Sequence, residues 1–237
     1  MSYQPGFAAV AHLLADHARA AMLAALLDGR ALAAGELARS AGVTAQTASA
    51  HLAKMLEGGL LDVETQGRHR YYRLAGPHVA HMLESLSTLQ PLPPQGRRPA
   101  LSPKAREFHF CRRCYDHLAG QLAVAITQAL QDRGYLVAAP DRQFDLTPAG
   151  AQWFADIGVD VDAVVPTRRG LARQCLDCTE RRHHLGGPLG VALLAALCEQ
   201  QVLRRAPDSR AIRVTPRGWS WLDQRLGMRL PALPQAA

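Results

Sequence analysis

The most restrictive feature of the sequence is the segment 35–59, which predicts two helices separated by a short break. The first helix is expected at about 35–40, and Gly42 interrupts the chain after it. Thr44 suits the N-cap of the second helix, because its hydroxyl can accept a hydrogen bond from a free backbone N–H. Apolar residues then recur at helical spacing until a glycine pair at 58–59 ends the helix.

The residues that follow change from helical spacing to a strand pattern. The stretch 60–74, LLDVETQGRHRYYRL, predicts two short strands around a turn at Gln66-Gly67. Two further helices are expected before the pair, at 7–14 and 18–27, and another after the strands, at about 77–89. Helix, turn, helix and hairpin in this order are the elements of a winged helix-turn-helix, whose second helix enters the major groove of DNA.

Polar and basic side chains lie where such a fold would meet DNA. The start of the second helix is rich in Thr, Gln and Ser, which can read base edges, and the turn of the hairpin is basic, as a phosphate contact requires. The residues expected to contact DNA are Thr44, Gln46, Thr47, Ser49, His51, Lys54, Arg68, His69 and Arg70. The pattern by itself also allows a winged helix that binds another protein.

Residues 7–90 resemble the ArsR/SmtB family of bacterial repressors. The resemblance is carried by the segments LLADHARAAMLAALLDG, ELARSAGVTAQTASAHLAKMLEGGLL and TQGRHRYYRL. It implies a homodimer that pairs through the first and last N-terminal helices and binds double-stranded operator DNA. It also implies repression of a nearby operon until an inducer binds. The paired cysteines that some relatives carry on the first helix of the helix-turn-helix are missing, because the first cysteine of this chain is Cys111.

Proline content indicates the domain organisation. The segment 91–103 holds five of the chain's 15 prolines and is typical of a semi-extended linker. It separates a DNA-binding and dimerisation domain, 1–90, from a C-terminal domain, 104–237, which is expected to act as the sensor. The predicted fold class is mainly α with small β-hairpins (α+β).

An internal repeat organises the C-terminal domain. The segment HLAG followed by QLAVAITQAL matches HLGG followed by PLGVALLAAL, and FDLTPAGAQWF matches IRVTPRGWSWL. Each Thr-Pro supplies an N-cap and a first helical residue, so helices are expected to begin at Thr147 and Thr215. The prediction is two helix–hairpin–helix repeats, at about 104–160 and 168–230, packed face to face as one domain.

Two CxxC pairs occur in this domain, each near a histidine of a repeat. The cysteines are expected within helical stretches, where each pair would place its sulfurs about one turn apart. Acids lie close by in the sequence, at Asp116, Asp177 and Glu180. The candidate metal or redox residues are Cys111, Cys114, Cys175, Cys178, His117 and His184.

Three interpretations of these cysteines remain open. Thiolates suit zinc or a thiophilic metal or metalloid, a reversible disulfide is a second possibility, and free cysteines are often core residues. Two half-sites of the repeat could converge on one pocket, although the symmetry is approximate. An alignment on the histidines pairs Cys111 with Cys178, whereas an alignment on the cysteines needs a three-residue insertion. The region also carries CYDHLAG-like and CLDxxERRxHLxG-like segments, through which it resembles a longer ArsR subgroup. In that subgroup a tryptophan is expected at the position of Cys178.

Composition narrows the remaining function classes. The net charge is +7, but residues 1–90 hold seven basic and seven acidic residues, so the excess lies after residue 90 and is weak evidence for DNA binding. No secretory signal or membrane-length apolar run occurs, so a cytoplasmic location with reduced thiols is expected. An enzyme is not expected, because no phosphate-binding glycine loop or serine nucleophile elbow is present. The alternative that stays open is a thiol- or metal-dependent enzyme in the C-terminal domain.

Overall fold

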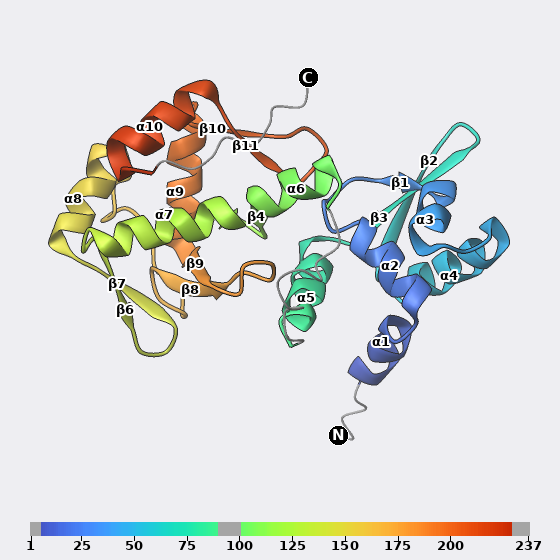
Figure 1. Cartoon of the computed structure of the whole chain (residues 1–237). Coiled ribbons are helices and arrows are strands. Elements are labelled where there is room, and N and C mark those ends of the chain that lie inside the picture. Colours follow the sequence, from blue (N-terminus) through green and yellow to red (C-terminus); the bar gives the residue numbers. More distant parts are fainter. Residues whose placement is uncertain (1–5, 90–100, 229–237) are drawn as a thin grey trace. The chain divides into compact units, whose positions relative to one another are not determined.

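Both parts of the chain combine helices with short antiparallel hairpins, which gives a mixed α/β structure (Figure 1). The computed structural model describes residues 6–89 and 101–228 and contains two units, Met1–Leu86 and Ser87–Ala237. Residues 91–100, most of the predicted linker, lie outside the described residues. None of the helices in the described ranges is both long and apolar enough to cross a membrane.

Unit 1 is a winged helix-turn-helix, as the sequence predicts. Its elements in chain order are α1 (Phe7–Leu14), α2 (His17–Ala25), β1 (Leu32–Ala33), α3 (Ala34–Ala41), α4 (Ala45–Glu57), β2 (Leu61–Gln66), β3 (His69–Leu74) and α5 (Pro77–Ser87). The strands form one antiparallel sheet in the order β1-β3-β2, and the β2–β3 hairpin is the wing (Figure 1). The two-residue strand β1, which pairs Leu32 with Tyr72, was not predicted.

Local chemistry fixes the two helices of the helix-turn-helix. Gly42 ends α3 in the left-handed conformation, with φ of 65°, which an L side chain rarely adopts. Thr44 caps α4, because its hydroxyl oxygen accepts from the backbone N–H of Thr47 at 3.2 Å. Both predicted features are therefore confirmed. The inner face of α4, with Leu52 and Met55 fully buried, packs in the apolar core of this unit.

Unit 2 contains two successions of hairpin, helix, hairpin and helix after a first helix, α6 (Pro103–Phe110). The first succession is β4 (Arg112–Cys114), β5 (His117–Ala119), α7 (Gln121–Asp132), β6 (Leu136–Ala139), β7 (Gln143–Leu146) and α8 (Pro148–Asp156). The second is β8 (Arg173–Leu176), β9 (His183–Gly186), α9 (Gly187–Glu199), β10 (Leu203–Arg205), β11 (Ile212–Val214) and α10 (Pro216–Leu226).

The hairpins of unit 2 pair in a crossed manner. Hairpin β6–β7 joins β8–β9 in a four-stranded sheet, and Ala211, the residue before β11, forms an antiparallel bridge with Arg112 of β4. The helices cross in the same way, since α7 packs against β9 and α9 packs against β5. Each hairpin that starts one succession is therefore held by the helix of the other.

The helix starts predicted for unit 2 are confirmed. Thr147 and Thr215 are the N-caps of α8 and α10, and each hydroxyl oxygen accepts from the backbone N–H three residues later, at 3.0 and 2.9 Å. The three tryptophans pack in or against the core of this unit. The rings of Trp153 and Trp221 lie 6.2 Å apart, and Trp219 lies 5.8 Å from Phe110.

The prediction that the CxxC pairs lie within helices is wrong. Cys111 directly follows α6 in an extended conformation, Cys114 is the last residue of β4, Cys175 lies in β8, and Cys178 lies in the turn after that strand. In each pair only one cysteine lies in a strand, and the other follows a helix or lies in a turn. The two cysteines of each pair are therefore separated rather than stacked on one helical face.

Candidate functional site

Helix α4 presents a polar outer face opposite its buried one. Gln46, Thr47, Ser49 and Lys54 are all exposed, whereas Ala48, Leu52 and Met55 are buried. Ser49 turns its hydroxyl back to the carbonyl of Ala45 at 2.9 Å. Helical periodicity thus separates the side chains that pack in the core of unit 1 from those that can contact the major groove of DNA.

The tip of the wing is basic and exposed. Gly67 has φ of 60° and makes the tight turn between β2 and β3 possible. Arg68, His69 and Arg70 follow it, and all three are exposed. The guanidinium of Arg70 lies 5.6 Å from the centre of the Tyr72 ring, a cation–π distance that orients this side chain.

His51 differs from the other residues expected to contact DNA. It is half-buried, and its Nδ1 lies 3.4 Å from Nη1 of Arg19 and 3.9 Å from a carboxylate oxygen of Asp16. Arg19 is itself buried and donates to the carbonyls of His12 and Leu13. The structure therefore places His51 in a polar cluster that joins α2 to α4.

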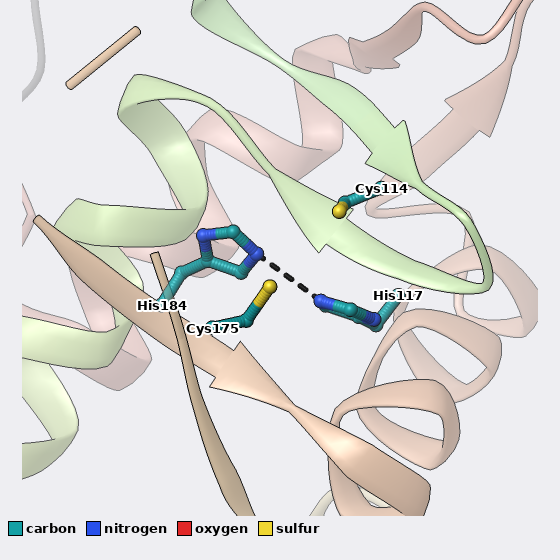
Figure 2. A group of neighbouring side chains, drawn as sticks. All are labelled: Cys114, His117, Cys175 and His184. Atoms are coloured by element: carbon teal, nitrogen blue, oxygen red, sulfur yellow. Dashed lines mark hydrogen bonds between the residues drawn. The ribbon is translucent and has the colours of Figure 1, made fainter. Parts of the chain in front are cut away.

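A second group of candidate residues converges inside unit 2. Cross-strand register pairs Cys114 with His117 in β4–β5 and Cys175 with His184 in β8–β9. Strands β5 and β9 contact each other, which brings the two Cys/His pairs together. In Figure 2 the four side chains point toward one another from the two hairpins.

The four side chains make a compact and largely enclosed group. Their candidate ligand atoms all lie within 4.8 Å of one another, and Nε2 of His117 is 3.1 Å from Nε2 of His184. Cys114, His117 and His184 are buried and Cys175 is half-buried. Two sulfurs and two imidazole nitrogens at this spacing can hold a metal ion.

The remaining candidate cysteines lie outside this group. Cys111 is fully buried in the apolar core, and burial raises the pKa of its thiol well above the ordinary value. The sulfur of Cys178 accepts from Nη2 of Arg112 at 3.1 Å. The structural counterpart of Cys114 is thus Cys175, a pairing that neither sequence alignment of the repeats suggested.

A buried ion pair supports the Cys/His group. Nη2 of Arg112 lies 3.0 Å from both carboxylate oxygens of Asp177, and the two side chains are 1% and 0% exposed. The carboxylate also accepts from the backbone N–H groups of Gly120, Thr179 and Glu180, at 2.7 to 3.0 Å. It therefore ties the turn after β8 to the strand β4 and to the start of α7.

Each histidine of the group has a carboxylate close to its Nδ1 atom. Asp116 lies 2.8 Å from Nδ1 of His117, and Asp177 lies 3.7 Å from Nδ1 of His184. Burial disfavours the charged form of His117, but the Asp116 carboxylate and the neighbouring Cys114 outweigh burial and raise its pKa to about 9. Burial likewise opposes ionisation of Asp177, yet Arg112 and the hydrogen bond from Gly120 hold its pKa far below the usual range.

Close approach of the backbone leaves little space around the group. A Cβ at Gly186 would lie 3.0 Å from Nε2 of His117 and 3.1 Å from Cβ of Cys175. A Cβ at Gly120 would lie 2.6 Å from the carbonyl oxygen of His109, and its φ is 89°. Glycine is therefore required where β5 and β9 lead into the helices α7 and α9.

Sequence reasoning missed Arg112, the residue that anchors Asp177. No local signal marks it, since its partner lies 65 residues away in the chain. The sequence could have indicated its place only through strand alternation. Arg112 and Cys114 lie two residues apart, so in a strand their side chains share one face.

Comparisons with known proteins agree with the fold of unit 1. A family model described as a helix-turn-helix domain matches residues 14–64. The chain is also similar to YdfF of Bacillus subtilis (strain 168), described as an uncharacterized HTH-type transcriptional regulator. The two are 40% identical over 228 residues, which cover 95% of this chain and 99% of the relative.

Solved structures resemble a smaller part of the chain. The homodimeric winged helix-turn-helix DNA-binding domain Mb0332 from Mycobacterium bovis, a possible ArsR-family regulator, is 30% identical with a TM-score of 0.34, covering 38% of this chain and 89% of that one. The cadmium metal-sensor CMTR from Mycobacterium tuberculosis is 32% identical with a TM-score of 0.31, covering 40% and 97%.

Proposed function

The chain belongs to the HTH-type transcriptional regulators, and on that premise we propose that it is a homodimeric repressor of the ArsR type released by an inducer. One observation carries the DNA-reading part. Helix α4 buries Ala48, Leu52 and Met55 and exposes Gln46, Thr47 and Lys54 beside a basic wing. Such a helix can enter the major groove while the wing contacts phosphates.

The dimer is supported by apolar residues that unit 1 leaves outside its core. Helix α1 has the sequence FAAVAHLL but contains no buried residue, and Phe7 is 71% exposed. Leu86 of α5 is 44% exposed. The resemblance to the ArsR family implies pairing through these two helices. A Phe7→Asp variant is expected to shift the protein toward monomer in analytical ultracentrifugation, with unchanged helical content by circular dichroism.

Operator reading through Gln46 can be tested directly. Fluorescence anisotropy with the protein's own upstream DNA, at several salt concentrations, should show tight binding that weakens steeply as salt rises. Gln46→Ala is expected to reduce discrimination against a mutated operator by about 1–3 kcal/mol. The matched control is Gln121→Ala, at the exposed first turn of α7 in unit 2. Absence of binding to any upstream fragment would instead favour a protein-interaction module.

We infer that unit 2 consists of two helix–hairpin–helix repeats and acts as the sensor. The order α7, β6–β7, α8 recurs as α9, β10–β11, α10, and both final helices have Thr-Pro caps. The inducer classes that fit cysteines and histidines are a zinc-like or thiophilic metal or metalloid and thiol oxidation, and a small ligand is the further alternative. Ligand binding would act by changing the spacing of the two α4 helices in the dimer, which alters operator affinity.

A further inference from the structure

We propose that Cys114, His117, Cys175 and His184 bind one zinc-type divalent ion in a closed four-coordinate site. The proposal concerns unit 2 itself and rests on the proposed regulatory function only for its consequence at the operator. It selects one cysteine from each CxxC pair and excludes Cys111 and Cys178. The ion class is the one that prefers tetrahedral thiolate and imidazole ligands, Zn²⁺ and by extension Cd²⁺.

The observed spacing suits such an ion. With Zn–N of about 2.05 Å and Zn–S of about 2.3 Å, a tetrahedron separates its ligand atoms by roughly 3.3 to 3.8 Å. The two Nε2 atoms are already 3.1 Å apart, and no ligand atom of the group is more than 4.8 Å from another. The longest of these distances would have to shorten by about an ångström to match the tetrahedron. Rotation of the side chains can supply a change of this size.

Charge also favours a divalent ion at this position. Two cysteines bind as thiolates and two histidines bind as neutral imidazoles, so the loaded site carries no net charge. A neutral cluster avoids the cost of a buried uncompensated charge, which matters where Cys114 and His184 are 6% and 1% exposed.

The carboxylates are placed as supporting groups for metal-bound histidines. Asp116 lies 2.8 Å from Nδ1 of His117, which leaves Nε2 to face the centre of the group. Nδ1 of His184 is buried and makes no hydrogen bond to any residue that the structure describes, and the Asp177 carboxylate lies 3.7 Å from it. A carboxylate behind the second ring nitrogen fixes the tautomer that binds a metal. Arg112 in turn holds Asp177 in position.

The site would join two parts of the chain that are distant in sequence. Cys114 and His117 belong to β4–β5, whereas Cys175 and His184 belong to β8–β9. An ion bound by both pairs closes a loop of about sixty residues, which restricts the unfolded chain and stabilises unit 2. Four protein ligands leave no open coordination position, so the site is of the structural or sensory kind rather than the catalytic kind.

The first test is the metal content of the purified full-length chain. After loading with zinc and desalting, elemental analysis should give one zinc per chain, and Cys114→Ser, Cys175→Ser and their double variant should lose it. The matched controls are Cys111→Ala and Cys178→Ser, the other member of each pair, which should keep it. A wild type without zinc, or equal loss in Cys178→Ser, would overturn the proposed ligand set.

Cobalt reports on the site without relying on the variants. The wild-type chain, stripped with a chelator and titrated with Co²⁺, should show the intense visible bands of tetrahedral cobalt and a near-ultraviolet thiolate band. Zinc should displace the cobalt and raise the melting temperature followed by tryptophan fluorescence by about 5 °C or more. Weak octahedral bands, or a melting temperature that zinc does not change, would contradict the proposal.

Operator binding separates this proposal from the regulatory function. Anisotropy is measured with the stripped and the zinc-loaded chain. Zinc binding by a chain that binds no operator would support the metal site and overturn the repressor. Operator binding by a chain that takes up neither zinc nor cobalt would overturn the metal site alone.

Discussion

In unit 1 the residues proposed to act lie on the outside of a helix, whereas in unit 2 they are enclosed between two hairpins. Gln46 and Thr47 are exposed, and the same helix turns its apolar residues inward. Cys114 and His184, by contrast, are buried, and their neighbours Arg112 and Asp177 are buried as well. The first arrangement follows from helical period, and the second from pairing between strands far apart in the chain.

The difference has energetic consequences. A side chain on an exposed helix face can be exchanged with little effect on folding, so its role shows mainly in binding. A buried polar group takes part in both folding and function, because each unsatisfied partner costs free energy. Substitutions in unit 1 should thus change DNA binding at nearly constant stability, while substitutions in unit 2 should change stability first.

The largest effect is expected from removal of the buried cation. Arg112→Met leaves the Asp177 carboxylate buried without its ion-pair partner, and should lower the free energy of unfolding of unit 2 by about 3–5 kcal/mol. Urea unfolding followed by tryptophan fluorescence measures this unit specifically, because the chain's three tryptophans all lie after residue 150. The experiment is done with chelator present, so that metal binding does not contribute.

Arg113→Met is the matched control for that experiment. Arg113 is the next residue of β4, on the opposite face and only half-buried. Its substitution should cost about 1 kcal/mol or less. Equal losses for the two variants would show that the buried pair contributes nothing specific, and the contrast between the units would fail.

The same contrast explains what the sequence could predict. The sequence predicts the Thr44 cap, the outer residues of α4 and the wing, because caps, helical spacing and turn residues are local signals. The turn itself lies one residue later than predicted, at Gly67-Arg68, because Gln66 pairs with His69. The two-residue strand β1 was missed, since no periodicity can be read over two residues.

In unit 2 the sequence singled out the cysteines and histidines but not their arrangement. Four of those six residues lie together in the structure, yet strands of three residues, β4 and β5, are too short for an alternating pattern to show. Cys114 and His117 face each other across a two-residue turn, whereas a longer connection of six residues joins β8 to β9, so Cys175 and His184 lie further apart in the sequence. That unequal spacing concealed the correspondence of Cys114 with Cys175. The contact of Arg112 with Asp177 has no local signal at all.

A smaller effect is expected at the wing, and on binding rather than folding. Arg68→Ala and Arg70→Ala should each weaken operator binding and reduce the slope of log affinity against log salt by about 1 for each phosphate contact removed. Arg73→Ala is the control, since Arg73 is also exposed on β3 but lies away from the tip. The urea midpoint should stay the same for all three. A loss of stability at Arg68 or Arg70 comparable to that of Arg112→Met would contradict the division between the units.

The smallest effects on stability are expected from the threonine N-caps, which occur in both units. Thr44, Thr147 and Thr215 each accept from a backbone N–H at the start of a helix. Substitution by alanine should cost about 1 kcal/mol at Thr44. The hydroxyls of Thr147 and Thr215 also donate to the carbonyls of Gly134 and Gln201, at 2.8 and 2.6 Å.

The two caps of unit 2 therefore anchor a helix to the preceding hairpin as well as starting it. Alanine at Thr147 or Thr215 should cost more than alanine at Thr44, by roughly the 0.5–1.5 kcal/mol of a second hydrogen bond. Serine keeps the hydroxyl and should restore most of the loss at all three positions. Chemical unfolding is followed by tryptophan fluorescence for α8 and α10. For α4, whose unit has no tryptophan, it is followed by circular dichroism of the whole chain, in which the change that fluorescence does not report belongs to unit 1. Equal costs at the three threonines would mean that the caps act only locally, and that the tighter coupling of unit 2 comes from its buried polar groups alone.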